Sequence, residues 1–212
     1  MKQGSQETLL ADGKSYVIRP ATQAVDGNHD GDRQVRNRTV KTTGGETPEA
    51  PVMYETGNDI SLKRRAELAA LMNQRLADAV DLQMQMKQAH WNVKGPSFIA
   101  LHELFDKVGE DVESYVDMIA ERVVQLGGVA EGTVRAAAAR SRLEEYPMTI
   151  GNGMAHVEAV ARALSNFGRE ARNTINQAIE LDDAGTADLF TEVSRGTDKW
   201  LWFVEAHSQA AR

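Results

Sequence analysis

The stretch from Phe98 to Gly128, "FIALHELFDKVGEDVESYVDMIAERVVQLGG", has an unusually regular hydrophobic pattern. Its apolar residues recur every three or four positions, which is the period of one face of an α-helix. These residues are Leu101, Phe105, Val108, Val112, Tyr115, Ile119, Val123 and Leu126. Ser97 offers an N-cap, and Gly127-Gly128 would end the helix. We therefore predict a long amphipathic helix from Phe98 to Leu126.

Three further segments carry the same helical period. They run from Ser61 to Val93, from Asn152 to Leu181 and from Thr186 to Ser208, with Gly95-Pro96 ending the first and Gly185 separating the last two. A shorter alanine-rich helix is predicted over Val134–Arg142, within the long connection between the second and third long helices. Four long amphipathic helices without strand-like alternation indicate an all-α fold, a four-helix bundle. The long connection suits a crossover that traverses the length of the bundle.

The first 59 residues lack this periodicity and are rich in glycine and proline. We predict an extended or flexible N-terminal tail over residues 1–59 and a helical bundle over residues 60–212. Within the tail, the segment Lys14–Pro20 ("KSYVIRP") could form a short strand that its proline ends.

The composition is that of a soluble globular protein, with 42% hydrophobic and 26% charged residues among 212. The absence of cysteine excludes disulfides, zinc ribbons and thiol catalysis. A net charge of -7 argues against broad, charge-driven nucleic-acid binding by the body of the protein. No apolar run is long enough to predict a transmembrane helix, and the first residues lack the apolar core of a signal peptide.

Four potential metal ligands lie along the helix predicted from Phe98: His102, Asp106, Asp117 and Glu121. At 100° per residue they fall at roughly 0°, 40°, 60° and 100° around the helix, so they share one side. Along the axis, however, His102 and Glu121 are roughly 28 Å apart, and Asp106 and Asp117 roughly 16 Å apart. One chain therefore cannot bring all four around a single metal ion.

The two pairs of positions have a common midpoint, between residues 111 and 112. If two copies of the helix pack antiparallel about a twofold axis at that point, His102 of one copy faces Glu121 of the other, and Asp106 faces Asp117. His90, at the end of the preceding helix, could complete each of the two equivalent clusters. The alternative is a solvated acidic face with one or two structural histidines, and spacing alone leaves both open. Glu-x-x-His pairs, which build a di-iron site within one bundle, are absent from the sequence.

Three motifs occur in order along the chain: "KQAHWNVKGPSFIALHELFD" (87–106), "DMIAERVVQLGGVAEGT" (117–133) and "TADLFTEVSRGTDKWLWFVEAH" (186–207). Together they resemble the Dps family, the miniature ferritins of bacteria, over about residues 61–207. The resemblance implies a ferritin-like four-helix bundle with a short helix in the crossover connection, assembled as a dodecameric hollow shell. It also implies an iron-oxidising and iron-storing mini-ferritin. Such a protein oxidises Fe(II) with hydrogen peroxide or oxygen, stores Fe(III) mineral and protects against oxidative stress.

The same resemblance implies ferroxidase centres at twofold interfaces, with iron as the metal. Carried over position by position, the ligands are His90, His102 and Asp106 of one chain with Asp117 and Glu121 of its neighbour. All five positions are filled in this sequence. Carboxylates with a few imidazoles suit iron.

Four other residues near these motifs have both a functional and a plain structural interpretation. Lys87 could tune the centre or be a solvated lysine, and Trp91 could intercept stray oxidising equivalents or simply pack. In the family, the junction that contains Asp183 and Asp188 lines threefold pores that draw in cations. Aspartates also favour the start of a helix, so capping is the alternative for both.

The tail raises the question of DNA binding, which many Dps proteins achieve through lysine-rich tails. Acidic residues outnumber basic ones here, and the one basic cluster consists of Arg33, Arg36, Arg38 and Lys41. Many copies on a shell could still bind DNA by multivalency. The alternative function is therefore a primarily DNA-binding architectural protein. The expected location is the cytoplasm, at the nucleoid, or the cell envelope if a leader was removed before residue 1.

A second tail motif, "DGNHDGD", matches the first half of a calcium-loop pattern. Its oxygen ligands would be Asp26, Asn28, Asp30 and Asp32, and the metal a second divalent cation besides iron. Asn37 stands where the pattern requires a terminal glutamate, so the match is weak. A polar turn is the alternative.

Overall fold

The computed structural model describes residues 7–11, 14–19 and 52–209. The chain divides into two compact units, residues 1–57 and 58–212. The prediction of a tail that is extended or flexible throughout residues 1–59 is not tested by these segments alone.

The first unit contains a three-stranded sheet in the order β1-β2-β3. Strand β1 (Glu7–Ala11) pairs antiparallel with β2 (Lys14–Arg19), and β2 pairs parallel with β3 (Val52–Tyr54). The strand predicted from Lys14 is confirmed, but β1 and β3 were not expected. The sequence did carry a signal for the first pairing, because only Asp12-Gly13 separates the two strands and this dipeptide favours a two-residue hairpin.

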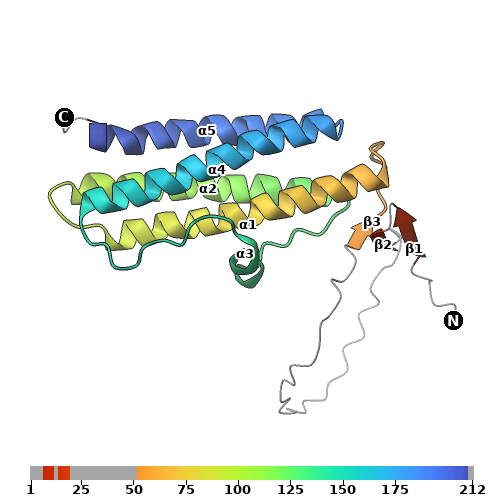
Figure 1. Cartoon of the computed structure of the whole chain (residues 1–212), viewed down its shortest axis with the longest axis horizontal. Helices are drawn as coiled ribbons and strands as arrows, with labels where there is room; N and C mark the ends of the chain where they lie inside the picture. Colours follow the sequence, from red (N-terminus) through yellow and green to blue (C-terminus); the bar gives the residue numbers. More distant parts are fainter. Residues whose placement is uncertain (1–6, 12–13, 20–51, 210–212) are drawn as a thin grey trace, which may run out of the picture. The chain divides into compact units, whose positions relative to one another are not determined.

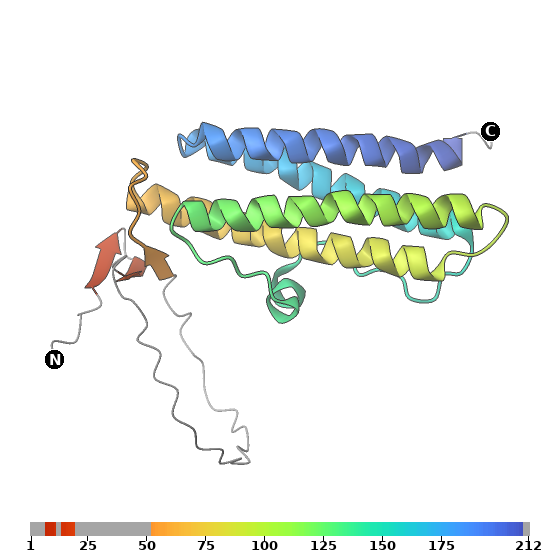
Figure 2. The ribbon, with the colours of Figure 1, turned by 180° about the vertical axis from the view of Figure 1, so that it is seen from behind.

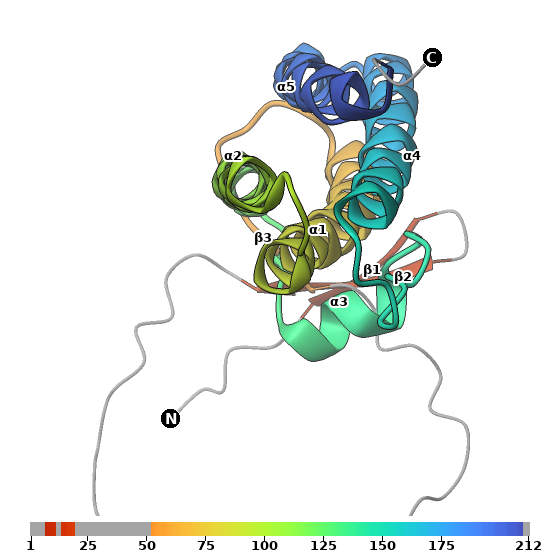
Figure 3. The ribbon, with the colours of Figure 1, turned by 90° about the vertical axis from the view of Figure 1, so that its left-hand side faces the viewer.

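The second unit consists of helices, which confirms the predicted four-helix bundle. The long helices are α1 (Leu62–Asn92), α2 (Phe98–Gln125), α4 (Gly153–Glu180) and α5 (Ala184–Gln209), with the short α3 (Val134–Arg140) in the connection. Figures 1 and 2 show the connection from α2 to α4 running along the length of the bundle, with α3 partway, as the crossover prediction requires. Seen end-on in Figure 3, the four long helices form the corners of the bundle, and α3 lies outside it beside α1.

The bundle core is formed by the apolar stripes that the sequence pattern defined. All eight stripe residues of α2 are buried, and Phe105, Phe167 and Phe190 are among the largest side chains with no exposed surface. Full burial of a large apolar side chain contributes about 1.5–3 kcal/mol, so these stripes supply most of the driving force for bundle formation.

Two helices end in the same way, with a residue in the left-handed conformation. Gly127 after α2 has φ 84°, and Asp182 after α4 has φ 57°. At both ends the amides of the left-handed residue and of the residue after it donate back to the last turn, as Gly128 N does to Val123 O at 3.0 Å. The prediction that Gly185 separates the last two helices is wrong. Gly185 lies inside α5, and Asp182 makes the break instead.

The predicted N-cap at Ser97 is also corrected in part. Ser97 precedes α2, but its side chain makes no capping hydrogen bond. Asn152 does cap α4, since its Oδ1 accepts from the amide of Ala155 at 2.8 Å.

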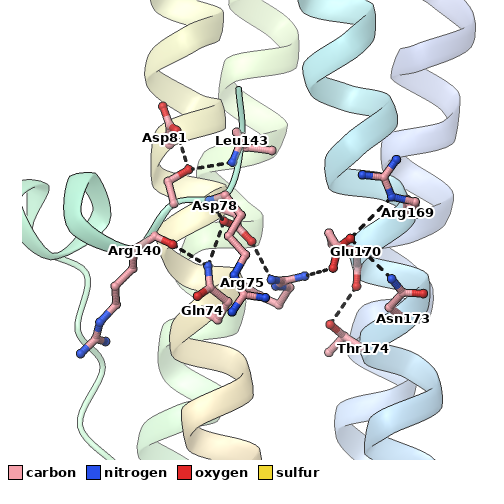
Figure 4. A network of polar contacts seen from close by, with 12 residues as sticks. Gln74, Arg75, Asp78, Asp81, Arg140, Leu143, Arg169, Glu170, Asn173 and Thr174 are labelled. Atoms are coloured by element: carbon pink, nitrogen blue, oxygen red, sulfur yellow. Dashed lines mark hydrogen bonds and ion pairs between the residues drawn. The ribbon is translucent and has the colours of Figure 1, made fainter. Parts of the chain in front are cut away.

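A network of polar side chains fastens the crossover connection to α1, as Figure 4 shows. Asp78 accepts a hydrogen bond from the amide of Arg142 at 2.8 Å and pairs with Arg75, whose Nη1 lies 2.8 Å from Glu170 of α4. Gln74 donates to the Arg140 carbonyl at 2.7 Å. Burial raises the pKa of Asp78, although Arg142 and Arg75 oppose that shift. The network therefore joins α1, α4 and the crossover in one place.

Candidate metal centre at the junction of the first two bundle helices

The turn between α1 and α2 brings two histidines together. Gly95 has φ 112°, a backbone conformation that favours glycine, and the Phe98 amide donates to its carbonyl at 3.0 Å. The turn reverses the chain, so that His90 in the last turn of α1 lies beside His102 in the second turn of α2. Their imidazole rings stack with centroids 3.7 Å apart and planes 22° apart.

Each of these imidazoles is held by the backbone of the other. His90 Nδ1 lies 2.8 Å from the His102 carbonyl oxygen, and His102 Nδ1 lies 2.8 Å from the His90 carbonyl oxygen. A carbonyl oxygen only accepts, so each Nδ1 must carry hydrogen and donate it. In its neutral form each ring then has its lone pair on Nε2, where a metal ion can bind.

Asp106, one turn after His102, is held by Lys87, whose Nζ lies 2.5 Å from its Oδ1. The Lys87 hydrogen bond is the main reason that the pKa of Asp106 is lowered, with charge effects from His90, Lys87 and His102 in the same direction and burial opposing. Asp106 Oδ1 is also 3.8 Å from His90 Nδ1. The structure thus brings His90, His102 and Asp106 together, and it pairs Lys87 rather than leaving it solvated.

Asp117 and Glu121 lie further along the same helix and are both exposed. Glu121 borders a hollow of about 470 Å³ together with Ala120, Val124, Gln125 and Ala130. Among the described residues, no group of three or more His, Asp or Glu side chains is placed to hold a metal ion. His90, His102 and Asp106 thus do not form such a group by themselves, and the spacing along α2 keeps Asp117 and Glu121 apart from them within one chain.

The two predicted pore residues differ sharply. Asp188 is exposed on α5. Asp183 is only 3% exposed and binds Arg122 through both carboxylate oxygens, at 2.8 and 3.0 Å. It also accepts hydrogen bonds from the amide and hydroxyl of Thr186 at the start of α5. Within this chain Asp183 is thus a helix cap and an ion-pair partner, and it offers no free carboxylate to a pore.

Sequence patterns predict no role for His156, which the structure places in a buried pair with Tyr146. The phenolic oxygen of Tyr146 lies 2.6 Å from His156 Nδ1, and the two side chains are 7% and 1% exposed. No spacing rule could reveal this pair, since it joins the irregular crossover to the first turns of α4. His207 is exposed and bonds only the carbonyl of Phe203, one turn back in its own helix.

The tail candidates lie outside the described residues. This applies to the possible metal ligands Asp26, Asn28, Asp30 and Asp32 and to the basic cluster from Arg33 to Lys41. In the part of the chain that the structure describes, no helix is long and apolar enough to cross a membrane.

Comparison with known proteins agrees with the bundle and with the motifs at this junction. The family model of the ferritin-like domain matches residues 69–212. The DNA protection during starvation protein of Agrobacterium fabrum is 41% identical over 156 residues, which span 74% of this chain and 96% of that protein.

Solved structures of Dps proteins are also similar to this chain. The Dps protein of Mycobacterium smegmatis in its tetragonal form superposes with a TM-score of 0.69 at 31% identity, over 72% of this chain and 92% of that one. DpsC from Streptomyces coelicolor has a TM-score of 0.71 at 28% identity, over 76% of this chain and 95% of that one. The residues matched by the family model, 69–212, include the histidine junction.

Proposed function

The chain belongs to the Dps family of ferritin-like proteins, and from that premise we propose that it oxidises and stores iron. Fe(II) is its substrate, hydrogen peroxide or oxygen the oxidant, and Fe(III) mineral the stored product. Removing both Fe(II) and peroxide protects the cell against oxidative stress. The activity is that of a ferroxidase, an oxidoreductase acting on metal ions.

The single observation that carries this proposal is the reciprocal pair of hydrogen bonds between His90 and His102. A histidine with a purely structural role needs its ring nitrogens hydrogen-bonded, and it gains nothing from an Nε2 that is left free. Here two rings are oriented by each other's backbone, and both keep the ligand nitrogen uncommitted. An ionised carboxylate, Asp106, lies beside them. Nitrogen and hard oxygen donors in this combination suit Fe(II) and Fe(III).

The rest of the coordination shell comes from a second copy of the chain. Two α2 helices packed antiparallel about their common midpoint bring Asp117 and Glu121 of one copy to His102 and Asp106 of the other. Each such interface holds two equivalent centres, and each can hold a pair of iron ions. Two Fe(II) ions together supply the two electrons that convert one peroxide to water, so no hydroxyl radical is released.

The assembly that follows is a closed homododecameric shell, with the mineral inside. Iron enters through acidic openings near the threefold axes, and Asp188 is the exposed carboxylate that serves there. Residues 1–59 precede the bundle in the sequence as the N-terminal tail, and the protein acts in the cytoplasm, at the nucleoid.

The direct test is the double substitution His102→Ala with Asp106→Ala. We expect the initial rate of Fe(II) oxidation by peroxide to fall at least about 100-fold, since outer-shell changes alone typically cost 10–100-fold. Glu103→Gln, on the same helix and exposed, is the matched control and should retain the rate. An unchanged rate in the double variant, with the shell intact, would remove these residues from the centre.

A second candidate function is DNA binding through the tail, and the name of the Agrobacterium relative, DNA protection during starvation protein, is what favours it. We propose that Arg33, Arg36, Arg38 and Lys41 contact phosphates from many copies at once. Changing all four to glutamine should abolish a duplex mobility shift at low salt and leave iron oxidation intact. A shift that persists, or no shift for the natural protein, would exclude this role.

A further inference from the structure

The buried pair of Tyr146 and His156 is a titratable site that iron coordination does not use. Tyr146 lies in the crossover connection, and His156 in the first turns of α4. Burial raises the pKa of the Tyr146 phenol, so the phenol keeps its proton. Burial also lowers the pKa of His156, with Lys94 adding to that shift and the backbone of Asn92 opposing it. A neutral phenol therefore faces a neutral imidazole at 2.6 Å.

The tautomer of His156 follows from the same contact. The phenol donates to Nδ1, so Nδ1 carries the lone pair and Nε2 the hydrogen. Nε2 is buried and makes no hydrogen bond of ordinary length and angle among the described residues, although the backbone of Asn92 faces the ring. Nδ1 is therefore the basic nitrogen of the ring, and it faces the proton of the Tyr146 hydroxyl.

The pair lies close to the turn that joins α1 and α2, the two helices that carry the proposed iron ligands. The backbone of Asn92, two residues after His90, faces the His156 ring. At the start of α4, a Cβ added to Gly153 would come within 2.8 Å of Leu101, the residue before His102, and within 3.5 Å of the Lys94 carbonyl. The first turn of α4 thus packs against the ends of both segments that carry the histidines.

We propose that Tyr146 and His156 form a redox-active pair that donates one electron to the iron centre when only a single Fe(II) is bound there. This inference rests on the proposed function, which supplies Fe(II) and hydrogen peroxide. In general, oxidation makes a phenol a strong acid, so a phenol gives up an electron readily only if a base takes its proton at the same time. His156 Nδ1 is that base.

The electrons and protons balance over three steps. One Fe(II) gives one electron to peroxide, the O–O bond breaks, and a one-electron oxidant of hydroxyl-radical class forms with one hydroxide. Tyr146 then donates an electron to that oxidant, which becomes a second hydroxide, while the phenolic proton moves to His156. A second Fe(II) later reduces the phenoxyl radical, and the proton returns from His156. With two protons from solvent, the sum is two Fe(II) and one peroxide giving two Fe(III) and two waters.

Two other aromatic residues serve as comparisons. Trp91 is adjacent to His90 in sequence, but it is 61% exposed, and no hydrogen bond of its indole is found among the described residues. Tyr115 is buried, and burial together with Asp111 and Glu192 raises its pKa to about 12, but no histidine accepts its proton. Tyr146 alone among the described tyrosines combines burial with an imidazole partner.

The test is freeze-quench electron paramagnetic resonance on the assembled protein, loaded with less than one Fe(II) per centre and mixed with peroxide. We expect a neutral tyrosyl signal, altered by ring-deuterated tyrosine, that is lost in Tyr146→Phe and retained in Tyr115→Phe. His156→Gln keeps a hydrogen-bond acceptor but cannot take the proton, so the radical yield should fall at least tenfold. Spin trapping should show more hydroxyl radical released by Tyr146→Phe. An equal signal in Tyr146→Phe, or a signal from an indole, would overturn the proposal.

Fe(III) formation, recorded on the same samples, separates this proposal from the one on which it rests. Normal iron oxidation without a Tyr146 radical overturns only the redox pair, whereas absent iron oxidation overturns the proposed function. A metal-free arm uses flash-generated ruthenium(III) tris(bipyridine) as the oxidant. A phenoxyl radical that forms there and depends on Tyr146 and His156 would support the pair independently of iron, and its absence would count against it.

Discussion

Two polar clusters of the bundle differ in one respect. In one cluster the charged groups find partners within the chain, whereas in the other the ligand nitrogens do not. In the network around Arg75, the guanidinium pairs with both Asp78 and Glu170, so the network joins α1, α4 and the crossover within one chain. In the cluster around His90 and His102, neither Nε2 atom has a hydrogen-bond partner among the described residues. In the first cluster each charged group has an oppositely charged partner in the same chain, although Arg75 Nε and Asp78 Oδ2 make no hydrogen bond, whereas the second cluster is the proposed half of a site shared between chains.

This difference explains why buried charge alone is a poor guide to function. Arg75 and Asp78 are 3% and 1% exposed, more deeply buried than any proposed iron ligand. Removal of one partner of a buried ion pair strongly destabilises the protein, yet the pair performs no chemistry. Unused ligand capacity, rather than burial, is what distinguishes the proposed metal centre.

The largest expected effect comes from breaking the complete cluster. Arg75→Met leaves Asp78 buried without its ion-pair partner, so we expect the free energy of unfolding to fall by about 3–5 kcal/mol. The measurement is denaturant unfolding at one fixed protein concentration, because assembly contributes to stability. Arg172→Met, which breaks the exposed pair with Asp198 at 2.8 Å, is the control and should change stability by less than about 1 kcal/mol. Equal effects of the two changes would contradict the role of the network.

A smaller effect is expected at the start of α5, where Asp183 and Asp188 should respond differently. Asp183→Asn keeps a capping residue but loses the Arg122 ion pair, so the free energy of unfolding should fall by about 1–3 kcal/mol at neutral pH. Asp188→Asn should leave stability unchanged and slow the uptake of Fe(II) into the shell. Slower uptake in Asp183→Asn without loss of stability would reverse this assignment.

The pH dependence of stability gives a second measure of Asp183. Burial would raise its pKa, but the hydrogen bonds from Thr186 and Arg122 outweigh burial and lower it below the ordinary value of 3.8. A carboxyl with a lowered folded-state pKa stabilises the protein above its unfolded-state pKa, and that contribution is lost as pH falls through the folded-state pKa. The stability difference between the natural protein and Asp183→Asn should therefore be constant above about pH 5 and shrink below pH 3.8. Unfolding curves across that range would show a constant difference if the account is wrong.

The smallest of these effects is expected at Lys87, which orients a ligand without being one. Lys87→Met removes the hydrogen bond to Asp106, and we expect Fe(II) affinity to weaken about tenfold, at the lower end for outer-shell changes. Calorimetric titration of Fe(II) without oxygen measures this. Tighter binding would show instead that the ammonium group competes with iron for the carboxylate.

The bundle was predicted well because the signal for each helix, a periodic apolar stripe, lies within one segment of the sequence. The apolar stripe of α2 determined both the helix and its buried face, and the ends of the long helices fall within two residues of the predicted positions. The error at Gly185 arose because Asp182 adopts a left-handed conformation that usually signals glycine. The hairpin of β1 and β2 was overlooked even though Asp12-Gly13 indicates it.

The features of the candidate site also divide into those that the sequence predicted and those that it did not. Helical geometry predicted that one chain could not close the ligand set, and the structure agrees with that geometry. The reciprocal histidine bonds and the Tyr146–His156 pair depend on how separate segments pack, and no pattern within one segment encodes such contacts. The sequence left open whether Lys87 tunes the centre or is solvated, because only its distance to Asp106 in the folded chain separates these two roles.

The central claim is that the open half-site of one chain is completed by a second chain. An anomalous-scattering crystal structure after brief soaking with Fe(II) tests it most directly. We predict iron peaks between antiparallel α2 helices, contacting His102 and Asp106 of one copy and Asp117 or Glu121 of the other. Iron bound elsewhere in the crystal while these positions stay empty, or iron held by one copy alone, would contradict the account.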